Sequence, residues 1–412
     1  MKSKLYLFGG GISSASTAFY SNSTNIQVLE KQNKVGGRIK SVKLGRDIFE
    51  AGAQFFTEKD RNVESFLKKL KLDNKINEVY LSNLNISRDN SIISLKKNCL
   101  QQDFDTHEIS ILYSYINHID DYLTNSSAKN LMSMSLKKWY NTFVGRNDEW
   151  FIDALVRSLT FSNIEKLSAY YGLIVISTFF SHTYNLKNGL IAAVDAAFAA
   201  SSAKISYNAN IESIAIDNNI SKVVVNGKEI QIDDNDYFVS GLPANILCKL
   251  VDDNKLKKAL NKIEYANAQV FFIETKKKLL KDAYGIMFPS GTSPISIIVE
   301  ETKGLTAKNG NGQLVVIFDG KTNVSSNEAL EITSNILPVK NQINSVNHYN
   351  WDGALPICTP ELFEIQNRIS KYNYKNFSIA GDFMGLPSLD AAIESGHNAA
   401  NNYNKFVKLR KT

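Results

Sequence analysis

Residues 5–14, Leu-Tyr-Leu-Phe-Gly-Gly-Gly-Ile-Ser-Ser, decide how this chain begins to fold. The apolar run Leu5–Phe8 predicts a buried strand, and the glycines after it predict a sharp turn. Small residues from Ile12 to about Tyr20 predict a helix, and Ile26–Glu30 predicts a second strand. Strand, helix and strand in this order predict a βαβ unit, which is built on parallel strands.

The glycine turn has the spacing of a dinucleotide-binding loop. Gly9, Gly11 and Ser14 fit the pattern G-x-G-x-x-(small). In that pattern the first glycine permits the turn, the second lets the backbone approach a pyrophosphate, and the small third residue lets the helix pack on the sheet. The helix that opens at Ile12 and Ser13 would present free N–H groups and a positive dipole end to the phosphates.

The residues after the second strand indicate which dinucleotide is bound. Glu30 ends that strand nineteen residues after Gly11, where a carboxylate can bind both hydroxyls of an adenosine ribose and repel a 2′-phosphate. Up to this point NAD and FAD fit equally well. Gly36, Gly37 and Arg38 would then return backbone and a guanidinium to the pyrophosphate, which favours FAD.

Val28-Leu29-Glu30 together with Gly36-Gly37-Arg38 resembles a marker segment of the flavin-containing amine oxidase superfamily. That superfamily includes monoamine oxidases, protoporphyrinogen oxidases, phytoene desaturases and renalase. The resemblance implies an α/β fold, with a Rossmann-like FAD-binding domain of the glutathione-reductase type on a parallel sheet. It also implies an interleaved α+β substrate domain and FAD bound without a covalent link.

Three further segments extend the resemblance. Glu50–Phe56 resembles the family's D-x-G-A-Q-x-F stretch, which approaches the flavin through its backbone, although Glu50 stands where Asp is more common. Ile205–Ile214 resembles the family's adenine-contacting strand, and the alignment implies a backbone contact from Ile211. Trp351 opens a segment that resembles the family's W-x-x-A-L-P stretch near the flavin. Its ring either lies against the flavin or packs in the core.

The C-terminal region resembles the family's second FAD motif. A predicted strand ends at Gly381-Asp382, and a helix opens near Ser388 and Leu389. Asp382 could accept hydrogen bonds from ribityl hydroxyls, and the helix would aim its positive end at the flavin. The expected FAD contacts are therefore Gly9, Gly11, Ile12, Ser13, Ser14, Glu30, Lys31, Gly36, Gly37, Arg38, Gly52, Ala53, Gln54, Ile211, Gly381, Asp382, Ser388 and Leu389.

The two FAD motifs at opposite ends predict interleaved domains. We expect residues 1–60, 186–245 and 346–412 to form the FAD-binding domain, and residues 61–185 and 246–345 to form the substrate domain. The stretch from about 60 to 185 is expected to be mostly helical. Ile205–Ile216 and Lys222–Val225 predict strands, with a turn at Asn226-Gly227.

The resemblance implies that the flavin itself carries the chemistry, so the catalytic residues stay unassigned. We expect a hydride to move from a C–N or C–C bond of a largely apolar small molecule to flavin N5, with oxygen as the electron acceptor. Amine oxidases of the family often place a lysine near N5, but no lysine lies between Lys281 and Lys303. The missing lysine favours the protoporphyrinogen oxidases and phytoene desaturases of the family over its amine oxidases. The alternatives are a non-catalytic binding protein that resembles Rab GDP-dissociation inhibitors, and an FAD-dependent redox-neutral isomerase.

Composition sets the remaining expectations. The 412 residues carry a net charge of +6, but Lys and Arg are spread along the chain, so no nucleic-acid partner is expected. The three cysteines and five histidines have no metal-ligand spacing, so no metal site is expected. The chain is expected to be cytoplasmic. A weak membrane-surface patch could combine Lys68–Lys71 and Lys137-Lys138 with Trp139-Tyr140.

Overall fold

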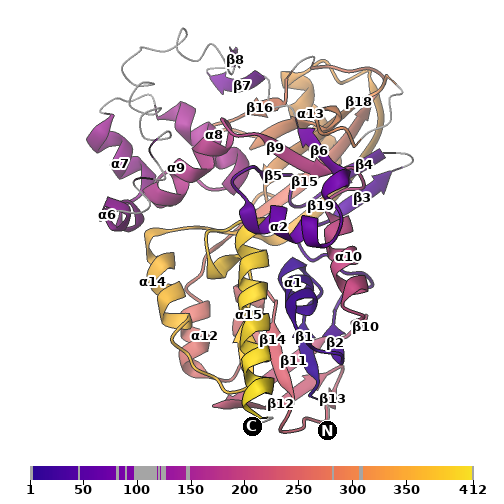
Figure 1. Ribbon diagram of the computed structural model, residues 1–412. Helices are drawn as coiled ribbons and strands as arrows, with labels where there is room; N and C mark the ends of the chain where they lie inside the picture. Colours follow the sequence, from indigo (N-terminus) through magenta and orange to yellow (C-terminus); the bar gives the residue numbers. More distant parts are fainter. Residues whose placement is uncertain are drawn as a thin grey trace.

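The computed structural model describes residues 3–44, 47–79, 83–88, 91–96, 118, 121, 127–144, 149–280, 283–305 and 310–410. The protein has two halves, one above the other in Figure 1. A parallel sheet with flanking helices forms the lower half, and a larger mixed sheet with a group of helices forms the upper half. Both termini lie at the far end of the lower half.

The lower half is built on a five-stranded sheet in the order β10-β2-β1-β14-β20, with every pair parallel. Alternate residues of β1 point to opposite faces, as the two-residue period of a strand requires. Leu5 and Leu7 pack with α1, α10 and α15, whereas Tyr6 and Phe8 pack with α11, α12 and α14. The strands are β1 (Leu5–Phe8), β2 (Ile26–Leu29), β10 (Lys204–Ser206), β14 (Tyr237–Ser240) and β20 (Phe377–Ile379), and the helices are α1 (Ile12–Tyr20), α10 (Ile191–Ala200), α11 (Ala244–Leu250), α12 (Asn254–Leu260), α14 (Pro360–Ile369) and α15 (Leu389–Leu409).

Helices α1 and α15, from opposite ends of the chain, pack closely along one face of this sheet (Figure 1). Small residues make the close approach possible. A Cβ added at Gly396 would lie only 2.2 Å from the backbone oxygen of Ser13. Ser16 Oγ donates to the oxygen of Ile393 over 2.7 Å, and Thr17 Oγ1 donates to the oxygen of Gly396 over 3.0 Å.

The predicted strand Ile205–Ile216 is two strands in the structure. β10 ends at Ser206 in the parallel sheet, and β11 (Ile211–Asp217) joins a separate antiparallel sheet with β12 (Asn219–Val225) and β13 (Lys228–Glu229). The break falls where Asn208 adopts a left-handed conformation with φ of 55°. The predicted turn is confirmed, since Asn226 and Gly227 have φ of 50° and 73°, as a type I′ hairpin turn requires.

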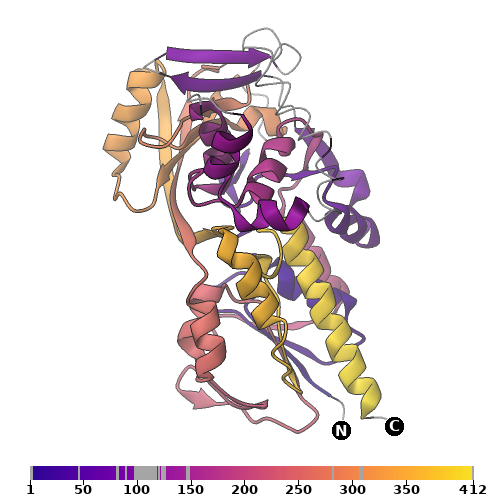
Figure 2. The ribbon, with the colours of Figure 1, turned by 90° about the vertical axis from the view of Figure 1, so that its left-hand side faces the viewer.

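The upper half contains a seven-stranded sheet in the order β19-β15-β18-β17-β16-β7-β8. β19 (Ile343–Pro356) pairs along almost its whole length with β15 (Tyr265–Thr275), so residues 346–356 belong to this sheet and not to the parallel one. Figure 2 shows these strands rising behind the helices of the upper half. The other strands are β7 (Asn83–Arg88), β8 (Ser91–Lys96), β16 (Gly285–Met287), β17 (Ser296–Val299) and β18 (Gly312–Asp319), and α13 (Ser326–Ile336) packs against one face.

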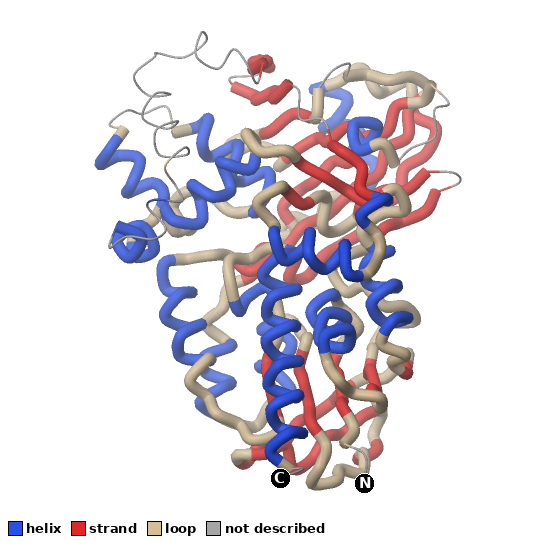
Figure 3. Tube along the Cα trace, viewed as in Figure 1, coloured by secondary structure: helices blue, strands red, loops and turns tan. Residues whose placement is uncertain are grey.

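In its described residues, the stretch from about 60 to 185 contains strands as well as the expected helices. The helices from α6 to α9 gather on one side of the upper half (Figure 3). β7 and β8, however, extend the large sheet, and β6 (Ile76–Val79) pairs with β9 (Thr183–Leu186). In β7, Leu84 and Ile86 alternate with polar residues, which is a strand pattern that the expectation of helices overlooked. The helices are α2 (Arg61–Lys69), α6 (Ser127–Ser133), α7 (Leu136–Phe143), α8 (Trp150–Thr160) and α9 (Ala169–Thr178), and the remaining elements are β3 (Ser41–Leu44), β4 (Asp47–Glu50), β5 (Phe56–Thr57) and the 3-10 turns η1 (Asp73–Lys75), η2 (Glu300–Lys303) and η3 (Asp382–Met384).

The suggested membrane-surface patch is wrong in its aromatic part. Trp139 and Tyr140 are buried in the core beside α9, so neither ring can reach a lipid surface. Lys137 pairs with Glu149 and Glu165 instead of standing free. Among the helices in the described part of the chain, none combines the length and apolar character needed to cross a membrane.

The close approach of α1 and α15 generates a stability prediction. Gly396→Ala should lower the free energy of unfolding by about 1–3 kcal/mol, because the added methyl group meets backbone that cannot move away without parting the helices. Denaturant unfolding of the variant would measure the change. Asn401→Ala, at an exposed position of the same helix, is the control and should change stability by less than about 0.5 kcal/mol. Equal stabilities for the two variants would contradict the prediction.

Candidate functional site

The glycine turn after β1 closes over the second strand. Gly9 has φ of 85°, a conformation that favours glycine. The Gly10 N–H donates to Glu30 Oε2 over 2.6 Å, and the Gly36 N–H donates to the oxygen of Gly10 over 2.8 Å. A Cβ added at Gly11 would meet nothing within 4 Å, so the start of α1 faces open space. The loop therefore leaves room for a ligand beside the helix N-terminus.

Glu30 is buried and already fixed in place by backbone donors. Besides Gly10, its carboxylate accepts a hydrogen bond from the Gln32 N–H over 2.7 Å. The backbone oxygen of Glu30 accepts from the Ala209 N–H over 2.9 Å. This bond holds residue 209 beside Glu30, and the chain continues from there into β11. Ile211, the first residue of β11, therefore lies on the same side of the sheet as Glu30, and Lys31 is exposed next to it.

An ion pair joins the two predicted FAD motifs. Arg38 Nη2 lies 2.8 Å from Asp382 Oδ1, although 344 residues separate them. Burial, the largest single influence, lowers the pKa of the Arg38 guanidinium, but Asp382 and Tyr265 together raise it above its usual value, so Arg38 stays charged. Its Nη1 is buried and has no hydrogen-bond partner among the described residues. Ser395 of α15 holds the loop before Asp382 by accepting from the Gly381 N–H over 2.9 Å.

The backbone of Gly52 and Ala53 runs against Arg38. The Ala53 N–H donates to the oxygen of Arg38 over 3.1 Å. A Cβ added at Gly52 would lie 1.9 Å from that same oxygen, so only glycine fits. Gln54 Nε2 donates to the oxygens of Glu50 and Gly52 over 2.8 and 2.9 Å, which leaves its Oε1 to face the upper half.

Gln54 Oε1 meets a lysine that the sequence did not indicate. Lys303, at the end of η2, donates from Nζ to both Gln54 Oε1 and Glu300 Oε1. The side chains of Lys303 and Glu300 are both 0% exposed, so this is a fully buried ion pair. Lys303 lies at the end of the stretch in which a lysine near the flavin was expected. The one sequence signal for it was the acidic run Glu300-Glu301 before it.

Glu50 contributes a second buried carboxylate to this cluster. It accepts hydrogen bonds from the Leu190 N–H over 2.8 Å and from Ser41 Oγ over 2.9 Å. Burial raises its pKa to about 7, against the lowering effects of these hydrogen bonds and of the Lys303 charge. Two buried carboxylates thus surround one buried ammonium group.

Trp351 lies beside the same segment. Its Nε1 donates to the oxygen of Ala51 over 2.6 Å, and its ring packs on that of Tyr349 with 4.7 Å between centroids. Apolar side chains from the large sheet and from the segment around β4 meet there. The cluster includes Phe49, Ala51, Val270, Phe272, Tyr284, Ile298, Val315 and Ile317, with Phe55, Phe161, Tyr349, Trp351 and Ala354 packed against it.

Helix α15 opens close to the ion pair. Ser388 caps it by accepting from the Ala391 N–H over 3.1 Å, so the helix begins at Leu389 as expected. The oxygen of Pro387 accepts from Tyr171 Oη of α9 over 2.7 Å. Cys358 is fully buried, and burial raises the pKa of its thiol to about 12, which suits a packing role.

The parallel sheet, the glycine loop and the carboxylate after β2 are the features of a dinucleotide-binding protein, and a second, larger sheet stands beside them. The chain belongs to the flavin containing amine oxidoreductase family, whose model matches residues 10–403. It is thus an FAD-dependent oxidoreductase and not the non-catalytic binding protein that was the first alternative.

Solved structures show the same fold at low sequence identity. A protein provisionally assigned as a protoporphyrinogen oxidase from Exiguobacterium sp. 255-15 superposes with a TM-score of 0.77 at 13% identity, over 98% of this chain and 99% of that one. A triple mutant of putrescine oxidase gives 0.78 at 11% identity, over 100% and 99%. A fatty acid isomerase from P. acnes that produces CLA gives 0.73 at 12% identity, over 96% and 97%.

The residues of the lower half fit FAD in their chemistry. Open space over Gly11 and the unpartnered Nη1 of Arg38 both suit a diphosphate, which accepts hydrogen bonds from backbone N–H groups and guanidinium nitrogens. Glu30 suits a ribose, because a carboxylate accepts from hydroxyl groups. Asp382, which keeps one oxygen on Arg38, suits the ribityl hydroxyls in the same way.

The buried cluster generates a prediction about pH. Because the pKa of Glu50 is raised from 4.5 to about 7, the stability tied to its proton is complete at acid pH and lost as the pH rises through 7. The wild type should therefore lose stability relative to Glu50→Gln between pH 5.5 and pH 8.5 by about 2 kcal/mol, because about 1.5 pH units of this range lie below the folded pKa, at about 1.4 kcal/mol each. Denaturant unfolding of both proteins at the two pH values measures this difference. Parallel pH profiles for the two proteins would show that Glu50 does not titrate in this range.

Proposed function

We propose that the sequence-predicted contacts hold FAD across the C-terminal edge of the parallel sheet. Gly9 to Ser14 and Glu30 would bind the ADP half, with Lys31 and Ile211 beside the adenosine. Arg38 would span from Asp382 to the diphosphate, with Gly36 and Gly37 shaping the approach. The backbone of Gly52, Ala53 and Gln54 and the start of α15 at Ser388 and Leu389 would face the flavin, with Gly381 placing Asp382.

We further propose that the enzyme moves a hydride from a C–N or C–C bond of a largely apolar small molecule to the flavin, with dioxygen as the electron acceptor. The observation that carries this proposal is the apolar cluster beside Gln54. It gathers aromatic rings from different parts of the chain, including Phe55, Tyr284 and Trp351, next to the segment expected to face the flavin. Such a surface excludes water and favours apolar substrates.

Lys303 favours the C–N alternative. In amine oxidases that this sequence resembles, a lysine near the flavin acts through water. Lys303 is buried and donates to Gln54 Oε1, so it lies beside the segment expected to face the flavin. Glu300 compensates its charge, which keeps the ammonium group in place in a dry environment.

The protein residues would position the substrate and control protons. Bound FAD supplies the hydride acceptor at N5. Lys303 could orient a water molecule or hold a proton at Nζ, while the apolar cluster keeps bulk water away from the reacting bond. Trp351, fixed by its bond to Ala51, would form one wall of the reaction space.

A redox-neutral isomerisation is the second candidate. The observation that favours it is the structural similarity to the P. acnes fatty acid isomerase. An isomerase returns its flavin to the starting state in each turnover, whereas an oxidase needs an electron acceptor. The two can therefore be separated by the state of the flavin without oxygen.

Anaerobic mixing tests the reaction type. The purified holoprotein would be mixed with primary and secondary amines, porphyrinogens, carotenoid precursors and unsaturated fatty acids while flavin absorbance is recorded. Bleaching by one class, reversed by air, is the expected result. Product formation without bleaching would establish the isomerase, and no response from any class would contradict both.

Lys303→Met provides the matched variant in that assay. It should slow flavin reduction by a bleaching amine at least about tenfold if Lys303 acts near the reacting bond. Lys262→Met, at an exposed position, is the control and should leave the rate unchanged. An unaltered rate in Lys303→Met would exclude a catalytic role for this lysine.

Asp382→Ala tests the FAD site directly. Loss of a charge-assisted bond, together with an unpaired Arg38, should weaken FAD binding about 10–100-fold. Titration of the FAD-depleted protein with FAD, followed by flavin fluorescence, measures the dissociation constant. Glu394→Ala removes an exposed carboxylate from α15 and should bind FAD normally. Equal affinity in both variants would place FAD elsewhere.

A further inference from the structure

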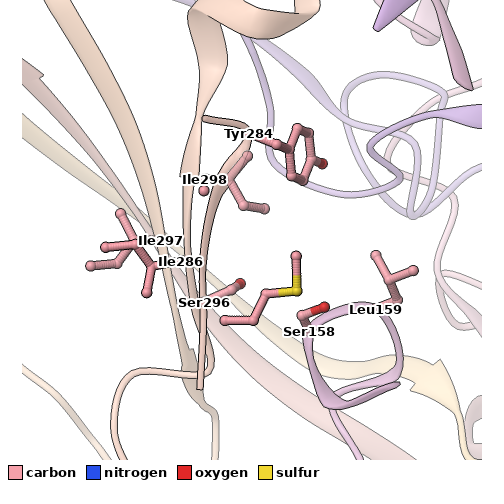
Figure 4. A pocket seen from close by; sticks show the side chains of 9 residues that line it. Ser158, Leu159, Tyr284, Ile286, Ser296, Ile297 and Ile298 are labelled. Carbon is pink, nitrogen blue, oxygen red and sulfur yellow. The ribbon is translucent and has the colours of Figure 1, made fainter. Parts of the chain in front are cut away.

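A pocket lies between α8 and the strands β16 and β17, on the face of the large sheet that is turned toward the helices (Figure 4). Ser158 and Leu159 of α8 line one side, and Tyr284, Met287, Ser296 and Ile298 line the other. Figure 4 shows Tyr284 and Ser296 on the side of the strands that faces Ser158, with Ile286 and Ile297 on the opposite side.

Two hydroxyl groups in this pocket have no hydrogen-bond partner among the described residues. They belong to Tyr284 and Ser296, whose side chains are 4% and 2% exposed. Buried hydroxyls are almost always hydrogen-bonded, so an unpartnered pair in one pocket indicates a group that binds there. Ser158 differs, because its Oγ donates to the oxygen of Leu155 over 2.7 Å.

The pocket and the apolar cluster of the proposed reaction site share the residues Tyr284 and Ile298. The Tyr284 ring packs edge-on against Phe55, with 6.3 Å between centroids, and Phe55 follows Gln54 directly in the chain. Both rings belong to the apolar cluster beside Gln54. A substrate that lies along this cluster would reach the pocket with its far end.

The charges around the pocket limit what that end can be. None of the residues that line it is Lys or Arg. The nearby Arg157 of α8 already donates to the oxygens of Phe288, Pro289 and Thr292. Burial foremost, and the Glu300 carboxylate second, raise the pKa of Tyr284 well above its usual value, so its hydroxyl stays protonated. An anionic group would therefore find no cation in the pocket lining, because the nearby Lys303 is already paired with Glu300, and burial without a partner disfavours such a group.

We propose that this pocket is a subsite for the hydroxyl or carbonyl end of an otherwise apolar substrate, with Tyr284 and Ser296 as its hydrogen-bond partners. Each hydroxyl can donate and accept, so the pair can bind either group. A subsite of this kind discriminates against analogues without the polar end, because its own hydroxyls would be left unpaired. The inference rests on the proposed function only in assigning the bound molecule as substrate.

Binding of 1-octanol and octanoate to the holoprotein tests the subsite without turnover. Isothermal titration should show 1-octanol binding at least tenfold more tightly than octanoate. Tyr284→Phe and Ser296→Ala should each weaken octanol binding about tenfold, whereas Ser158→Ala, in the same pocket, should leave it unchanged. Octanol binding that is absent, equalled by octanoate, or indifferent to both variants would overturn the proposal.

Thermal unfolding provides the second measurement. Neither hydroxyl has a hydrogen-bond partner in the described part of the chain, so Tyr284→Phe and Ser296→Ala should keep or raise Tm in the ligand-free protein. A clear fall in Tm for both variants would show that the hydroxyls are structural and would overturn the subsite. Octanol binding that follows the prediction, in a protein that bleaches with no compound of the panel, would leave the subsite standing and remove the proposed oxidation.

Discussion

The ion pair between Arg38 and Asp382 is the contact on which the arrangement of the chain depends. It forms only if the loop after β2 and the loop after β20 meet at the same edge of the parallel sheet. Parallel strands place their carboxyl ends together, so the sheet supplies this meeting point. The whole large sheet is built from residues between the two loops, so the chain has to leave the lower half and return to it.

Local contacts are the part of this site that the sequence reveals. The glycine loop, Glu30 and the helix at Ser388 act through neighbouring residues or through one strand pairing, so their spacing is visible in the chain. Lys303 was missed because its contact with Gln54 spans 249 residues and depends on how the two halves dock. Another long-range contact, the pairing with β15, shows that β19 runs through residue 346, where the sequence suggested a domain limit. Trp139 and Tyr140 looked like surface aromatics beside lysines, but helix packing buries both rings.

The burial of Glu50, Glu300 and Lys303 together lowers the stability of the protein beside Gln54, where we propose the reaction site. Removing the Glu300–Lys303 ion pair and the Glu50 carboxyl from water is expensive, and the attraction of Lys303 for the two carboxyls repays that cost only in part. Glu50 also caps the start of α10 through Leu190, so the cluster ties a helix of the lower half to a turn of the upper half. Hydrophobic residues could fill the same volume, but they could not hold an ammonium group beside Gln54. The same cluster therefore holds the two halves together and sets the charge around the proposed reaction site.

The packing of α1 against α15 bears on how the protein is made. Ser13 is synthesised long before Gly396. During synthesis, the face of α1 that packs on α15 therefore stays uncovered until α15 emerges. Arg38 likewise has no Asp382 to pair with until that late part of the chain is made. The proposed FAD site is thus complete only after segments made early and late have met.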